Sequence, residues 1–556
     1  MKNYLFSIGG SGSKVVEALL HMNALGILTE KRDEEISVIF IDLDGNNGNY
    51  TRTDATSKIC KELREALPET MKRASFIVSN WMPASGTGNY IASMLGFSNE
   101  LMDQGEKGDL LGILKSTYAD EELLESFDVG FKGHPNIGKA YFSLELPLIW
   151  ENPNDALRVC IDSIVSSKES SVKVMLAGSI FGGTGASAIP ALVETIREKK
   201  KEKDSASRSL GKKSNLNISS ILMLPYFSLQ DAGAGDESMR ISSGDFIAKV
   251  KSGLEYYAEN GIVYGEGSLF DSVYLAGSGN GRPSVYAYHE GKSDQRNCAN
   301  IAEIVAGKEY KDYLGWDIDS EPKKESYRGL FICDAPLDAK GKWNWASFSD
   351  VKFFQCIGSF LNISIYLALY GQKLMEELSR KRKVSGDFKN YFNQLDKDNK
   401  STAAQKLSSI AKYLKCFVNW FSDVISDLPA EFTYGDPTVV CNIPRNSLVD
   451  HSALDDLKIY YNLHDEKFNR INFDSSSASA DPILKNIIAL SISEKELQEK
   501  MSAAMEKMFM EKNPQVTKEY VSLGLQMAGA RKTDANAAFS DFFTKLASLC
   551  TPGIQD

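Results

Sequence analysis

Two glycine-rich segments carry the residues best suited to bind phosphate. One spans residues 9–13 and the other residues 182–187, and each follows a short apolar run. Glycine lets the main chain approach a ligand closely, and N–H groups at the start of a helix attract negative charge. Either segment alone could serve tight packing, but together they predict a phosphate site. Its predicted residues are Gly9, Gly10, Ser11, Gly12, Ser13, Gly182, Gly183, Thr184, Gly185 and Ala186.

The first segment departs from both common nucleotide motifs. A P-loop needs a glycine directly before its lysine, and the residue before Lys14 is a serine. A dinucleotide fingerprint needs a third glycine, where this chain has Val15. A Rossmann-type enzyme that uses a dinucleotide or S-adenosylmethionine is therefore a weaker hypothesis. The chain also has no HExxH or GxSxG arrangement, which disfavours a zinc peptidase or a serine hydrolase.

Apolar patterns predict the elements that position these segments. Helical spacing follows each glycine segment, at residues 14–26 and 186–199. Five apolar runs are typical of buried strands, and they span residues 3–8, 36–43, 172–177, 218–227 and 270–276. Strands that alternate with helices predict an α/β fold with a mostly parallel sheet. In such folds the ligand lies beyond the carboxyl ends of the strands.

Length, charge and cysteine content narrow the class of protein. A chain of 556 residues predicts two or three domains. The net charge of -11 disfavours general nucleic-acid binding, and the basic run at residues 197–214 is typical of a solvated loop. No apolar run predicts a membrane span or a signal peptide, and the eight cysteines form no CxxC pair. These observations favour a cytoplasmic location.

Several segments, in the same order along the chain, resemble the tubulin/FtsZ superfamily. Residues 177–196 (AGSIFGGTGASAIPALVETI) resemble its GGGTG[ST]G signature, with Phe181 where a further glycine is usual. Residues 133–142 (GHPNIGKAYF) resemble the FtsZ pattern GANPEVGRKAA. The resemblance implies a Rossmann-like GTPase domain of a divergent bacterial tubulin-like protein. Because Phe181 is bulky, we expect it to narrow the space for phosphate.

The resemblance also implies nucleotide contacts outside the two glycine segments. Asp44 stands at the end of the second strand, where the family has an acidic or amide residue. Asn300, with Asn297 in reserve, stands where an asparagine pairs with the guanine edge, although either amide could instead cap a helix. Lys139 could bring a positive charge to the terminal phosphate or be an exposed helix lysine. The segment that contains it supplies Gly133, Pro135, Asn136, Gly138 and Lys139.

A catalytic loop is implied by residues 341–354 (GKWNWASFSDVKFF), which resemble the FtsZ loop GLMNVDFADVKTVM. In that family the acidic residues of this loop enter the nucleotide site of the next subunit and position the hydrolytic water. Asp350 matches the second acid, Ser347 replaces the first, and Asn344 is one residue out of register. Loss of one acid predicts slow hydrolysis, because activation of a water contributes about a hundredfold to ten-thousandfold.

These features divide the chain into three parts. Residues 1–306 are predicted to form the nucleotide-binding domain, residues 307–355 an insertion with the catalytic loop, and residues 356–556 a helix-rich region. Within the last two parts, helical spacing is found at 351–378 and 494–512.

Two functional hypotheses follow from the resemblance. The first is a protein that binds GTP and GDP, assembles head-to-tail into an oligomer or filament, and hydrolyses GTP with the help of Mg²⁺ at a site shared between subunits. The alternative is a nucleotide-gated signalling or defence subunit with weak or no GTPase activity, which recruits a protein partner through its C-terminal half.

Overall fold

The computed structural model describes the parts of the chain on which the following account rests. They are residues 2–29, 31–81, 91–94, 115–123, 126–131, 133–206, 215–229, 243–260, 268–277, 284–286, 299–316, 329–333, 363, 367, 371, 373–426, 525–526 and 533–550.

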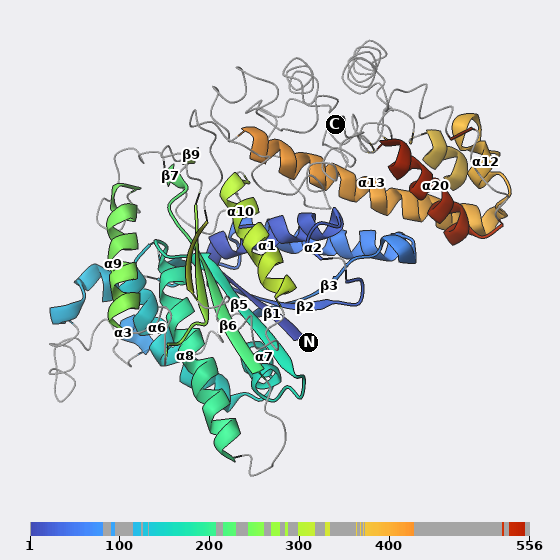
Figure 1. Cartoon of the computed structure of the whole chain (residues 1–556). Helices are drawn as coiled ribbons and strands as arrows, with labels where there is room; N and C mark the ends of the chain where they lie inside the picture. Colours follow the sequence, from blue (N-terminus) through green and yellow to red (C-terminus); the bar gives the residue numbers. More distant parts are fainter. Residues whose placement is uncertain are drawn as a thin grey trace.

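A seven-stranded sheet, in which every strand is parallel to its neighbours, forms the centre of the molecule (Figure 1). Its order is β10-β8-β6-β5-β1-β2-β3. The strands are β1 (Lys2–Ile8), β2 (Glu35–Ile41), β3 (Ser75–Trp81), β5 (Ser171–Ser179), β6 (Asn215–Met223), β8 (Ser272–Ala276) and β10 (Gly329–Cys333). The order of strands reverses between β1 and β5, and in doubly wound sheets this switch point is the usual ligand site. The predicted α/β fold with a parallel sheet is confirmed.

Helices cover both faces of this sheet (Figure 1). One face carries α1 (Gly9–Ala24), α2 (Gly48–Ala66) and α10 (Ile301–Gly315). The other carries α6 (Pro135–Leu148), α7 (Ala156–Val165), α8 (Gly183–Ala206) and α9 (Phe246–Glu259), with the short α3 (Ile91–Met94) and α5 (Asp120–Leu123) near them. Strand β4 (Asp128–Phe131) precedes α6, and β7 (Phe227–Leu229) pairs with β9 (Ser284–Tyr286). Short 3-10 turns span Glu69–Met71, Ile149–Glu151, Ser243–Asp245 and Gly386–Phe388.

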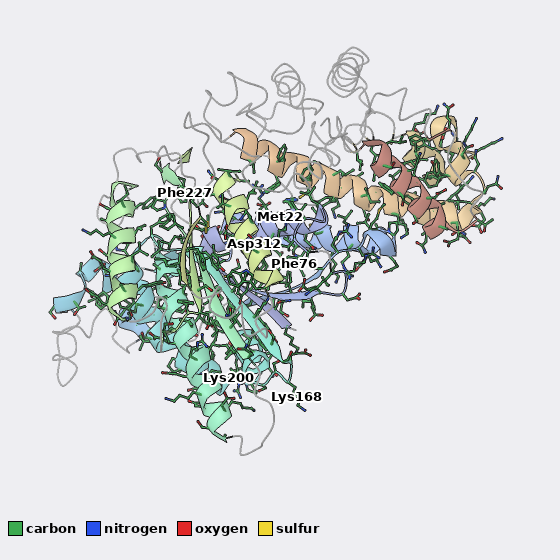
Figure 2. The ribbon with its side chains drawn as sticks, in the orientation of Figure 1. Met22, Phe76, Lys168, Lys200, Phe227 and Asp312 are labelled. Atoms are coloured by element: carbon green, nitrogen blue, oxygen red, sulfur yellow. The ribbon has the colours of Figure 1, made fainter. Side chains whose placement is uncertain are left out.

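Alternating side chains of the strands fill two hydrophobic cores, one on each face. In β1, Leu5 belongs to the core under α1 and α10, whereas Phe6 belongs to the core under α6 and α8. Met22 of α1 contributes to the first core, and Figure 2 shows the side chains that fill both layers. Because both faces are covered, the strands are almost continuously apolar, as parallel sheets require.

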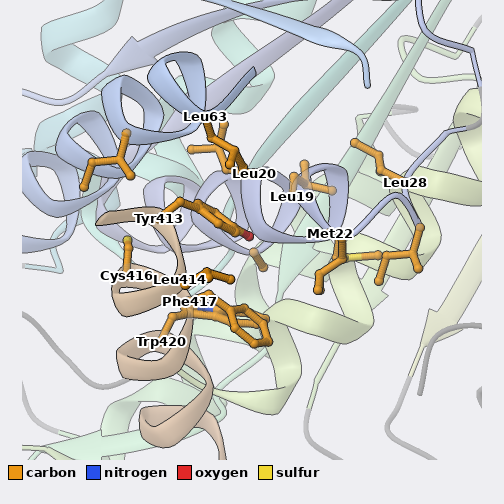
Figure 3. Close-up of a cluster of buried hydrophobic side chains, with 14 of the residues drawn as sticks. Leu19, Leu20, Met22, Leu28, Leu63, Tyr413, Leu414, Cys416, Phe417 and Trp420 are labelled. Carbon is orange, nitrogen blue, oxygen red and sulfur yellow. The ribbon is translucent and has the colours of Figure 1, made fainter. Parts of the chain in front are cut away.

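The described C-terminal residues are helical and extend the first core. They form α12 (Lys389–Phe392), α13 (Lys397–Ser426) and α20 (Ala535–Cys550), and α13 packs along α1 and α2 (Figure 3). The ring of His21 in α1 stacks on Trp420 of α13, with centroids 4.5 Å apart. The predicted helix at 351–378 lies only partly within the described residues, and the predicted helix at 494–512 lies outside them. None of the described helices has the length and apolar character needed to cross a bilayer.

Three differences separate the sequence-based predictions from the structure. Strand β3 was missed because it is a sheet-edge strand whose side chains are mostly part-exposed. Strand β10 lies inside the predicted insertion at 307–355, and it pairs with β8 in the main sheet. Helix α8 continues to Ala206 through the first part of the basic run predicted as a loop, and Lys200 lies near its far end (Figure 2).

Candidate phosphate-binding site

Helices α1 and α8 begin side by side at the switch point of the sheet. Gly9 is the first residue of α1 and Gly183 is the first residue of α8, so each predicted glycine loop forms the opening turn of a helix. A Cβ atom on Gly9 would lie 3.4 Å from the Cβ atom of Thr184 and 3.9 Å from the main-chain nitrogen of Gly185. The two segments, which are more than 160 residues apart in sequence, therefore form one cluster of main-chain N–H groups.

Two of the predicted residues allow the helices to pack closely on the central strand. A Cβ atom on Gly12 would lie 2.4 Å from the carbonyl oxygen of Ala177, and one on Gly185 would lie 2.5 Å from that of Ser179. These glycines are buried and bring α1 and α8 onto β5. The part-exposed residues of the two turns are Gly10, Ser11, Gly182, Thr184 and Ala186, and these are the ones that a ligand could reach.

The electrostatics of the two turns favour an anion. Neither α1 nor α8 has an acidic residue in its first turn, so no side chain of that turn neutralises the positive end of the helix dipole. Ser13 donates a hydrogen bond back to the carbonyl oxygen of Gly9 at 3.3 Å, and Ser187 donates to that of Gly183 at 2.6 Å. These bonds direct both hydroxyl groups along their own helices.

A third segment, the turn that precedes α6, closes against the second glycine segment. Gly130 and Gly133 have φ angles of 72° and 76°, which only glycine adopts without strain. A Cβ atom on Gly183 would lie 2.6 Å from the Cβ of Phe131 and 3.2 Å from the nitrogen of Gly133. Pro135 opens α6, as its fixed φ favours, and this helix also has no acidic residue in its first turn. The structure thus brings all three predicted segments together.

The remaining predicted residues of this third segment serve packing or point to other partners. A Cβ atom on Gly138 would lie 2.2 Å from the hydroxyl of Ser187, so this glycine allows α6 to cross α8 closely. The amide of Asn136 donates to Glu122 at 2.8 Å. The amine of Lys139 lies 2.5 Å from the hydroxyl of Tyr256 in α9 and is exposed. Lys139 is therefore an exposed helix lysine, which was the alternative that the sequence left open.

The turn after β2 lies on the other side of the first glycine segment. A Cβ atom on Gly10 would lie 3.1 Å from the side-chain nitrogens of both Asn47 and Asn49. Asn47 also caps α2, because its side chain accepts a hydrogen bond from the nitrogen of Asn49 at 2.9 Å. Asp44 is buried and accepts from the nitrogen of Asn46 at 3.0 Å. Asp44 was predicted from the sequence, whereas the two asparagines were not, although polar residues follow the strand at this turn.

Asp42 is a second acid in this turn, and it was not predicted from the sequence. It accepts hydrogen bonds from the nitrogen of Asp44 at 3.2 Å and from the side chain of Asn47 at 3.3 Å. Burial raises the pKa of Asp42 to about 7, and the neighbouring Asp44 adds to this shift. Among the described residues no group of three or more His, Cys, Asp or Glu side chains could hold a metal ion.

Phe181 packs away from the glycine segments. Its ring is buried against Phe246 of α9, with centroids 4.7 Å apart, and against Phe227 at 5.6 Å. The expectation that Phe181 narrows the space for phosphate is therefore corrected, because the ring anchors α9 instead. On the same helix, the amine of Lys249 donates to the carbonyl oxygen of Gly133 at 2.8 Å, and no sequence pattern pointed to this lysine.

Asn300 caps α10 in a buried network next to α1. Its side chain accepts from the nitrogen of Ala302 at 2.9 Å, and its own nitrogen donates to Glu303 at 3.0 Å. Glu303 forms a buried ion pair with Lys14, with the two charged atoms 2.6 Å apart, and accepts from the hydroxyl of Tyr226 at 3.2 Å. The side-chain oxygen of Asn300 is thus engaged as a helix cap.

Four predicted site residues lie outside the described residues. They are Asn297, Asn344, Ser347 and Asp350. Comparisons of the chain with protein-family models, with curated proteins and with solved structures found no match in any of the three.

Proposed function

We propose that this chain is a guanine-nucleotide-binding protein of the tubulin/FtsZ type. The observation that carries the proposal is the close approach of Gly9 to Thr184, which brings two helix N-termini together at the switch point of a parallel sheet. Two converging sets of main-chain N–H groups without acidic residues in their first turns suit a chain of phosphates. Gly133, where the third segment of the resemblance (residues 133–142) begins, lies against the first residue of α8 and supports the proposal.

The proposed activity is hydrolysis of GTP at a site shared between subunits that assemble head-to-tail. Asp350 of one subunit, with Ser347 and Asn344 beside it in sequence, would position the water against the terminal phosphate of the next. Mg²⁺ would be held mainly by the phosphates, which suits a site with few carboxylates. Such heterologous contacts propagate into filaments unless the geometry closes a ring.

The direct test uses Ser11, where an aspartate should preserve the fold but weaken phosphate binding. Ser11 lies in the first turn of α1 and is part-exposed. Aspartate there favours the helix dipole, so Ser11→Asp should preserve folding, but its charge should repel phosphate. Ser11→Asn is the matched neutral control. Nucleotide released from the purified, denatured full chain should be GTP or GDP for the parent protein and for Ser11→Asn, and absent for Ser11→Asp.

The outcomes of this test are distinct. Adenine nucleotide or a dinucleotide in the parent protein would redirect the assignment to another class. Equal guanine-nucleotide content in Ser11→Asp and Ser11→Asn would show that the phosphates do not bind at the first turn of α1.

A second candidate function, nucleotide-gated signalling, is favoured by the position of α13. The helix that opens at the first glycine segment, α1, also carries His21, which stacks on Trp420 of α13 (Figure 3 labels Trp420). Helix α13 of the C-terminal region therefore contacts α1, the helix whose first turn would bind phosphate. Light scattering with GTP and with GDP separates the candidates, because polymer that depends on GTP is expected only from the assembling protein.

A further inference from the structure

Helix α9 packs on residues 180–181, directly before the second glycine segment, and offers one face to them. Phe246 contacts the ring of Phe181, and a Cβ atom on Gly253 would lie 3.0 Å from the Cγ1 atom of Ile180. These two positions are seven residues apart and so lie on the same side of the helix, two turns from each other. The glycine at 253 lets this part of α9 approach closely.

Lys249 lies between these two positions on the same face. It follows Phe246 by three residues and precedes Gly253 by four. Its amine reaches the carbonyl oxygen of Gly133 at 2.8 Å, and the nitrogen of Gly133 is 3.2 Å from where a Cβ atom on Gly183 would lie. The amine is thus held at the corner where the turn before α6 meets the first residue of α8.

Among the described residues, the charge of Lys249 has no carboxylate in direct contact. Gly133 offers this amine only its neutral carbonyl oxygen. Burial lowers the pKa of Lys249, while the more distant Asp245 acts in the opposite direction. By contrast, the amine of Lys14 is paired with Glu303, and that of Lys139 lies over the ring of Tyr256.

We propose that Lys249 binds the terminal phosphate of a nucleoside triphosphate and makes the site selective for triphosphate over diphosphate. This inference rests on the proposed function. Lys14 lies in α1 and Asn300 caps α10, and these helices cover one face of the sheet, whereas α9, which carries Lys249, lies on the other face (Figure 1). A nucleotide whose base is near α10 therefore extends its phosphates toward α8, and its last phosphate meets Lys249. The amine exchanges the carbonyl of Gly133 for a phosphate oxygen.

The experiment compares the affinities of the full chain for GTP and GDP by equilibrium dialysis. Lys249→Met removes the charge and keeps the apolar stem, and it should weaken GTP binding by about tenfold or more, as loss of a charged hydrogen bond does. GDP binding should change by less than about threefold, within the scatter of a surface substitution. Lys249→Arg keeps the charge and should retain most of the preference for GTP.

Lys251→Met is the matched control. Lys251 lies two residues along the same helix, and its side chain is 77% exposed. Its replacement should leave both affinities unchanged. A parent protein that binds neither nucleotide overturns the proposed function and this inference with it. A parent protein that binds GTP while Lys249→Met keeps the same ratio of GTP to GDP affinity overturns only the role of Lys249.

Discussion

Lys14 and Glu303 form an ion pair in the protein interior, with 3% and 0% of their side chains exposed and 2.6 Å between Nζ and Oε1. The pair joins the second turn of α1, directly after the first glycine segment, to the first turn of α10. At the other end of α10, the buried amine of Lys173 in β5 donates to the carbonyl oxygens of Tyr313, Leu314 and Trp316. Two buried lysines therefore fix both ends of α10 to the elements that carry the glycine segments.

Removal of one partner of the Lys14–Glu303 pair should be costly. Glu303→Gln leaves a buried ammonium without its counter-charge, and the expected loss in free energy of unfolding is about 3–5 kcal/mol. Urea denaturation followed by circular dichroism measures this loss. The double variant Lys14→Met/Glu303→Leu should recover much of it, because neither charge of this pair then remains in the interior. A double variant as unstable as the sum of the single variants Lys14→Met and Glu303→Leu would show that the two side chains are not coupled.

The stability of the protein should fall in mild acid because of His21. Burial lowers the pKa of His21 well below 6.5, and Arg52 adds to the shift. When the pH falls below about 6.5, the unfolded chain gains a proton at this residue while the folded chain keeps a neutral ring. The free energy of unfolding should therefore decrease with pH, by up to about 1.4 kcal/mol per unit from this group, until the folded pKa is reached.

His21→Phe keeps an aromatic ring against Trp420 and should remove this component. Urea midpoints measured from pH 8 down to pH 5.5 compare the two proteins. If the urea midpoints of the parent protein and of His21→Phe fall in parallel over this range, groups other than His21 cause the acid sensitivity.

Gly12, which lets α1 pack closely on the sheet, should not tolerate a methyl group. In Gly12→Ala the new Cβ would lie 2.4 Å from the carbonyl oxygen of Ala177, so α1 must shift, at a cost of about 1–3 kcal/mol. Gly315→Ala is the control, because a Cβ atom there has no atom within 4 Å. This second change should be neutral or stabilise by about 0.5–1 kcal/mol. Equal melting temperatures for the two variants would contradict the close packing of α1.

Hydrolysis should depend on Asp350 while binding does not. If this acid positions the attacking water from a neighbouring subunit, Asp350→Ala should retain bound GTP and lose phosphate release by about a hundredfold or more. Ser347→Asp restores the first acid of the motif and should raise the rate. Released phosphate measured against protein concentration checks the shared site, since turnover per chain should rise as subunits associate. Unchanged turnover in Asp350→Ala would remove this residue from catalysis.

The sequence by itself determined the local elements of the site. Apolar runs located β1, β2, β5, β6 and β8, because strands buried on both faces must be almost continuously apolar. Glycine located both helix openings, since only residues without a side chain let α1 and α8 approach β5 as closely as Gly12 and Gly185 do. The apolar pattern did not predict the two edge strands, because few side chains of β3 are buried and β10 is short and part-exposed.

Only the tertiary structure decided which distant residues meet. The strand order places the first and second glycine segments side by side, and no local pattern encodes that order. Phe181 was expected to narrow the space for phosphate, yet it anchors α9, and Asn300 takes the helix-cap role that was one of its predicted alternatives. Lys249 belongs to no sequence motif, and its amine reaches Gly133 only because α9 packs across residues 180–181. The physical reason is that long-range packing, rather than local propensity, sets where a side chain points once the cores have formed.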